Sequence, residues 1–124
     1  MLHTRRDWLL DQLQELAEAL LAHLAGAKLA DPIDEAQLLG ATGLSGVAAE
    51  RLSLGTLRLL LTGVDGRFDG PRALSVGLVL ARRGADAGEP QLQQKGLALL
   101  DAAIAADPTL EDPSLRELRR ALRA

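Results

Sequence analysis

Leucines at helical spacing along the start of the chain are the feature that most constrains its fold. They recur four, three, four and four residues apart, at Leu9, Leu13, Leu16, Leu20 and Leu24. This spacing places all of them on one face of an amphipathic α-helix. The pattern predicts a helix over about residues 4–25, with Thr4 as its N-cap and Gly26 marking its end.

The composition argues against a sheet beside this helix. Hydrophobic residues make up 48% of the chain, mostly leucine and alanine, whereas aromatic residues make up 2% and β-branched residues are few. Pleated sheets are built mainly from β-branched and aromatic side chains. The length of 124 residues suits one ordinary domain. We therefore expect a single all-α domain over residues 1–124, with five to seven helices.

The remaining helices are predicted from their caps and breakers. Short helices are expected over Ile33–Leu39, over Val47–Leu52 and after Ser53 as an N-cap. A longer helix is expected from Pro71 to about Arg83, where Gly84 stops it. A turn over 85–90 follows, and then a second long helix over Gln91–Ala106. The last helix is expected from Pro113 onwards.

Small residues line one face of the helix that begins at Pro71. They recur at helical spacing as Ala73, Gly77, Ala81 and Gly84. Gly96 lies in the apolar stripe of the next helix, where a glycine costs about 1 kcal/mol of helix propensity. Close approach of the two helices at these small residues would compensate for that cost.

The absence of cysteine excludes disulfides, thiolate zinc sites, iron–sulfur clusters and a cysteine nucleophile. The charged residues near the N-terminus differ from the apolar stretch of a signal peptide, and apolar runs fall short of the roughly 18 residues of a membrane span. We expect a cytoplasmic protein without membrane contact.

The sequence offers no convincing catalytic, cofactor or metal site. The histidines His3 and His23 lack converging partners, and the serines lack the context of a nucleophile. The turn cluster at 63–70 lacks the ligands of a calcium loop, and no phosphate-binding glycine loop is present. We expect no bound metal or cofactor and no enzymatic activity.

Trp8 lies outside the leucine stripe of the first helix, on the side that also carries Gln12. A large aromatic side chain there either packs against the following helices or contacts a partner, because tryptophan is enriched at interfaces. Both alternatives stay open at this stage. Trp8 and Gln12 are therefore candidate partner-binding residues.

The last helix carries arginines on the face opposite its leucines. The arginines are Arg116, Arg120 and Arg123, and the leucines are Leu115, Leu118 and Leu122. The arginines either bind phosphate or an acidic partner, or form a solvated face that complements the helix dipole. The net charge of −3 and the scarcity of aromatic residues argue against nucleic acid and favour the solvated face.

Several motifs resemble a family of small bacterial helical proteins of unestablished function with a tetratricopeptide-like C-terminal half. They are Arg6-Asp7-Trp8-Leu9-Leu10, Leu52-Ser53-Leu54, the segment Phe68–Ala81 and the segment Leu99–Pro108. The chain departs from the standard 34-residue unit in its spacing, contains no second copy, and is short over Asp31–Gly46.

The resemblance implies a helical bundle that ends in a tetratricopeptide-like antiparallel helix pair and a capping helix. Stacked helical hairpins present concave apolar surfaces without catalytic groups. We therefore expect a protein–protein interaction or scaffolding module, whose partner is another protein or a second copy in a homodimer. The alternatives are a nucleic-acid or phosphate-binding module that uses the arginine face, and an enzyme whose site combines scattered carboxylates.

Overall fold

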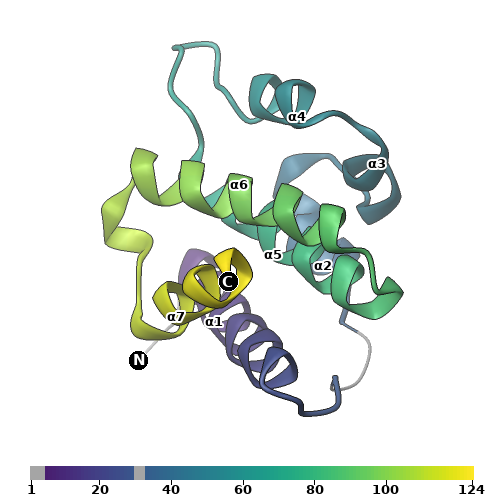
Figure 1. Cartoon of the computed structure of the whole chain (residues 1–124). Coiled ribbons are helices and arrows are strands. Elements are labelled where there is room, and N and C mark those ends of the chain that lie inside the picture. Colours follow the sequence, from purple (N-terminus) through teal and green to yellow (C-terminus); the bar gives the residue numbers. More distant parts are fainter. Residues whose placement is uncertain (1–4, 30–32) are drawn as a thin grey trace.

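The computed structural model describes residues 5–29 and 33–124, which form seven α-helices and two short 3-10 helices (Figure 1). The α-helices are α1 (Arg5–Leu24), α2 (Glu35–Leu39), α3 (Gly46–Arg51), α4 (Leu54–Leu60), α5 (Gly70–Ala87), α6 (Pro90–Ala106) and α7 (Pro113–Arg123). The 3-10 helices are η1 (Gly40–Thr42) and η2 (Pro108–Leu110). The all-α prediction with five to seven helices is confirmed, whereas the expectations for His3 and Thr4 lie outside the described residues.

Helices α5 and α6 form an antiparallel hairpin at the centre of the fold. Residues 73–82 of α5 are all buried. A β-carbon at Gly96 would lie 2.6 Å from the carbonyl oxygen of Gly77 and 2.9 Å from the backbone nitrogen of Ala81. The predicted close approach of the two helices at their small residues is therefore confirmed.

The predicted end of α5 at Gly84 is wrong. The helix continues to Ala87 and ends at Gly88, which adopts the left-handed conformation (φ 66°) typical of a helix C-terminus. Gly84 instead lies against α6, where a β-carbon would come within 2.8 Å of the backbone nitrogen of Gln93. Its small size serves helix packing, so the turn is much shorter than the expected 85–90.

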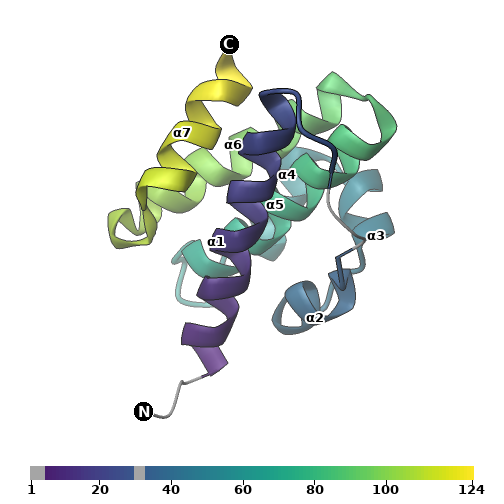
Figure 2. The same ribbon diagram turned by 90° about the horizontal axis from the view of Figure 1, so that it is seen from below.

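Helix α1 crosses the hairpin beside α7 (Figure 2). Both helices bury most of the leucines that the sequence assigned to their apolar faces. On α1, Leu9 is half-buried and Leu24 is 39% exposed. The Ser114 hydroxyl donates a hydrogen bond of 3.2 Å to Glu18, which ties the start of α7 to α1.

The short helices α2, α3 and α4 lie on the other flank of the hairpin. Asp34, Ser45 and Ser53 are their N-caps, and each accepts a hydrogen bond from a backbone N–H of its helix. Ser53 was predicted in this role. Helix α2 begins at Glu35, two residues after the predicted start, because Asp34 caps it.

Candidate docking groove and its surroundings

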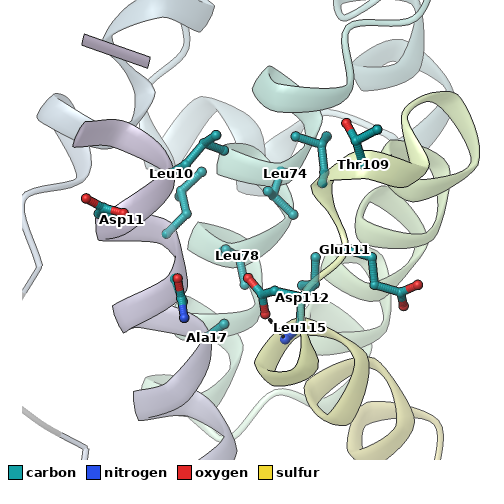
Figure 3. Close-up of a pocket in the computed structure, with 12 residues that line it drawn as sticks. Leu10, Asp11, Ala17, Leu74, Leu78, Thr109, Glu111, Asp112 and Leu115 are labelled. Atoms are coloured by element: carbon teal, nitrogen blue, oxygen red, sulfur yellow. Dashed lines mark hydrogen bonds between the residues drawn. The ribbon is translucent and has the colours of Figure 1, made fainter. Parts of the chain in front are cut away.

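A pocket of about 450 Å³ lies between α1, α5 and the η2–α7 segment (Figure 3). Its floor is apolar and consists of Leu10, Leu13, Ala17, Leu74, Leu78, Leu110 and Leu115. Its polar edge consists of Asp11, Gln14, Thr109, Glu111 and Asp112. We call this pocket the α1–α7 groove. Three carboxylates and no lysine or arginine line it, so the groove combines an apolar floor with an acidic edge.

The three carboxylates of the groove differ in the hydrogen bonds that they accept from the chain itself. Asp112 caps α7 and accepts a hydrogen bond of 2.8 Å from the backbone N–H of Leu115. Glu111 accepts a hydrogen bond of 2.6 Å from Arg119. Among the described residues, Asp11 has no comparable contact and is exposed. It is therefore the carboxylate of the groove that is available to an incoming cation.

Asp11 also begins an acidic stripe that continues along the outside of α1. Glu15 and Glu18 follow it at helical spacing and are exposed. Residues 7–22 contain four acidic residues and no lysine or arginine. The acidic stripe (Asp11, Glu15 and Glu18) extends the negative potential of the groove along the helix.

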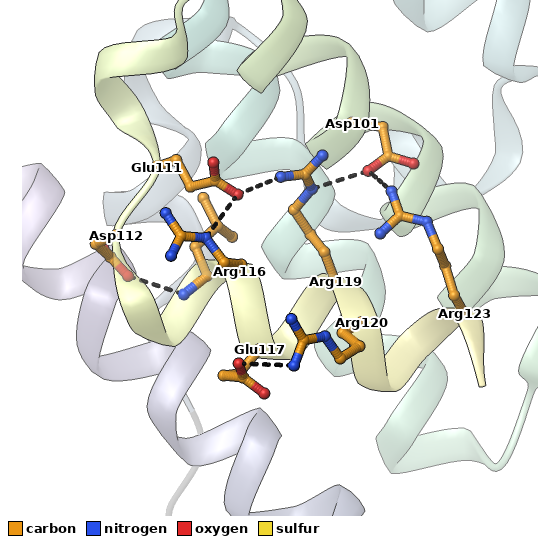
Figure 4. A network of polar contacts seen from close by, with 9 residues as sticks. Asp101, Glu111, Asp112, Arg116, Glu117, Arg119, Arg120 and Arg123 are labelled. Carbon is orange, nitrogen blue, oxygen red and sulfur yellow. Dashed lines mark hydrogen bonds and ion pairs between the residues drawn. The ribbon is translucent and has the colours of Figure 1, made fainter.

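The arginines of α7 lie against carboxylates of the chain itself (Figure 4). Arg119 bridges Asp101, at 2.9 Å, and Glu111, while Arg123 also contacts Asp101. Arg116 lies 3.8 Å from Glu111, and Arg120 lies 3.2 Å from Glu117. The pairs with Asp101 and Glu111 fasten α7 to α6 and to the residue that follows η2, and all four arginines have part of their charge neutralised.

Trp8 and Gln12 are both half-buried on α1. Trp8 lines a cavity of about 260 Å³ together with residues of α2 and η1, among them Leu38 and Ala41. The chain itself therefore provides much of the cover that Trp8 requires. The two residues are not brought together with Arg116, Arg120 and Arg123, which lie on α7.

Sequence reasoning missed a polar cluster that holds the short helices to the hairpin. Arg83 of α5 donates to Glu35 of α2 at 2.8 Å and to Glu50 of α3 at 3.0 Å. Burial works to lower the pKa of Arg83, but the hydrogen bonds and charges of the two glutamates outweigh it and raise the pKa. The cluster therefore serves as a structural clamp.

Lys95 of α6 holds the C-terminal end of α3 by hydrogen bonds. Its Nζ donates to the backbone carbonyl oxygens of Ala49, at 3.0 Å, of Glu50, at 2.9 Å, and of Leu52. A cation at this place complements the negative end of α3. Burial lowers the pKa of Lys95, which Glu50 opposes in part.

The described residues show neither a metal site nor a membrane-spanning helix, and the chain matches no known protein in the comparisons. Among the described residues, no group of three or more His, Asp or Glu side chains is placed to hold a metal ion. None of the described helices has the length and apolarity needed to cross a membrane. The chain matches no protein-family model, no curated protein and no solved structure.

Proposed function

We propose that the protein is a protein–protein interaction module that binds an apolar, basic segment of a partner in the α1–α7 groove. The observation that carries the proposal is the apolar floor of the groove beside an edge with three carboxylates and no cation. Its volume falls in the range of about 300–1,000 Å³ typical of binding pockets.

The groove favours a segment with leucine-like side chains on one side and lysine or arginine on the other. The apolar side chains would leave water for the leucine floor, and the cations would face Asp11 and the acidic stripe. The α5–α6 hairpin supplies a rigid base for such a site, as the resemblance to tetratricopeptide-like proteins also suggests. In this proposal the protein acts by binding and not as an enzyme.

A synthetic helical peptide of leucine and lysine tests the proposal, with a leucine–glutamate peptide of the same pattern as its control. We expect saturable binding of the lysine peptide in fluorescence anisotropy, weakening as salt is added, and no binding of the glutamate peptide. Asp11→Lys is expected to weaken binding about tenfold, since a favourable charge contact becomes a repulsive one.

Two further variants separate groove binding from unspecific attraction to a negative protein. Gln14→Arg places a bulky cation on the groove edge and is expected to weaken binding as Asp11→Lys does. Glu89→Lys makes the same charge change as Asp11→Lys at an exposed position of the α5–α6 turn and is expected to have no effect. Equal weakening by Glu89→Lys and Asp11→Lys would contradict the proposal.

A further inference from the structure

The segment 54–68, which contains α4 and the following loop and which we call the α4 arm, exposes large apolar side chains. Leu59 is 75% exposed, Leu60 is 56% exposed and Val64 is fully exposed. They lie close together in the sequence, on one short helix and the turn after it. Large exposed apolar side chains that follow one another along a short segment point to a surface that contacts another protein.

The loop of the α4 arm is closed by its own hydrogen bonds. The backbone N–H of Gly63 donates to the carbonyl of Arg67 at 2.8 Å, and the N–H of Asp69 donates to the carbonyl of Leu61 at 2.8 Å. These bonds hold Val64 at the tip of a defined turn. An apolar tip that is already ordered costs less conformational entropy on binding than a flexible one.

The α4 arm contains two arginines and one aspartate, which give it a formal net charge of +1. Arg58 lies 5.9 Å from the ring centre of Phe68, and Arg67, whose side chain is 89% exposed, forms an ion pair with Asp65 at 3.9 Å. The arm therefore combines exposed apolar side chains with exposed arginines. This is the chemistry that the α1–α7 groove is proposed to bind.

We propose that the segment bound in the α1–α7 groove is the α4 arm of a second copy of this chain, an inference that rests on the proposed function. In Figure 1 the arm lies above the α5–α6 hairpin, whereas α1 and α7, which border the groove, lie below it, so an arm does not reach the groove of its own chain. Charge complementarity between the arm's arginines and Asp11 sets the orientation.

An interface between two different surfaces of one chain is heterologous. After one such contact, the pair still has one free groove, on the copy that gave its arm, and one free arm, on the other copy, so association continues head-to-tail unless a ring closes. The wild-type protein is therefore expected to grow beyond a dimer as its concentration rises. Added salt is expected to reverse this growth.

Two single variants and their mixture test the proposal by sedimentation velocity. Asp11→Arg blocks the groove and leaves the arm intact, whereas Val64→Asp blocks the arm and leaves the groove intact. Each variant alone is expected to associate at least tenfold more weakly than wild type. An equal mixture is expected to form a complex of two chains and no larger species, because only one arm and one groove are functional.

Matched variants control for loss of folding and for a general change in charge. Val47→Asp changes an apolar side chain of α3 that is 48% exposed, and Glu89→Arg makes the charge change of Asp11→Arg elsewhere. Both are expected to associate like wild type. Circular dichroism of every variant is expected to show the wild-type helix content.

Two results would overturn the inference. A wild-type protein that stays monomeric at every concentration, while still binding the leucine–lysine peptide, would remove the second copy as partner and leave the proposed function intact. Association that Val64→Asp abolishes and Asp11→Arg leaves unchanged would show a symmetric contact between two arms. Failure of the peptide to bind would instead count against the groove itself.

Discussion

The α5–α6 hairpin and the α4 arm are both rich in leucine and glycine but differ in how much of their apolar surface is buried. In the hairpin, Gly77 and Gly96 bring two helix backbones into contact, and the leucines around them are buried. In the arm, Leu57 is fully buried whereas Leu59 is 75% exposed. Apolar composition alone therefore does not decide whether a side chain is buried. Burial also requires a second helix that can approach closely.

The largest effect is expected from a side chain placed between the two hairpin helices. Gly96→Val forces a β-carbon against backbone atoms of α5, which cannot move away as a flexible side chain could. We expect the free energy of unfolding in urea to fall by about 3 kcal/mol or more. Gly55→Ala in α4 is the control, since nothing lies within 4 Å of its β-carbon. A small loss for Gly96→Val would show that the hairpin is loosely packed.

A smaller loss of stability is expected when the clamp between the hairpin and the short helices, formed by Arg83, Glu35 and Glu50, is broken. Arg83→Met leaves the half-buried Glu35 and Glu50 without their cation, so we expect a loss of about 2 kcal/mol in urea unfolding. Arg72→Met is the control. It removes an ion pair with Asp69 in which the arginine side chain is 51% exposed, so we expect a loss of less than about 0.5 kcal/mol. Equal losses would mean that Arg83 contributes no more than a surface pair.

Lys95, which holds the end of α3 against α6, gives this attachment a pH dependence. Its pKa is lowered in the folded protein, so between that value and the unfolded value of about 10.4 the unfolded chain binds more protons and stability rises with pH. Relative to Lys95→Met, wild type is expected to gain up to about 1.4 kcal/mol per pH unit in this window. Lys28 is the other lysine, and tyrosine and cysteine are absent, so few groups interfere. A relative loss of stability with rising pH would contradict this.

The smallest effect is expected in the arm. Leu59→Ala removes a side chain that is 75% exposed, so we expect a change of less than about 0.5 kcal/mol in the free energy of unfolding. Thermal unfolding followed by circular dichroism measures this in dilute protein. A loss above about 1 kcal/mol would show that the arm is stabilised by its own chain, and would weaken the contrast with the hairpin.

The sequence predicted what depends on local spacing. The leucine faces of α1 and α7 and the packing role of Gly96 follow from residues three and four apart on one helix. Gly84 was misread as a helix end, because its packing depends on Gln93 in another helix. The resemblance to tetratricopeptide-like proteins stays a prediction.

The candidate groove could not be predicted, because its residues come from three parts of the chain. Asp11, Leu74 and Glu111 become neighbours only when α1, α5 and the η2–α7 segment pack. Lys95 did leave a signal, since it follows Leu92 by three residues and precedes Leu99 by four, within an apolar stripe. A charge at such a position indicates a partner on a neighbouring element.

Trp8 of α1 lies against α2, so its fluorescence reports on the contact between these two helices. The chain contains one tryptophan and no tyrosine, so its fluorescence under ultraviolet excitation arises almost entirely from this indole. Because the ring is half-buried beside α2, its emission wavelength depends on how much water reaches the contact between α1 and α2. Movement of α2 away from α1 would shift the emission to the red without any attached dye.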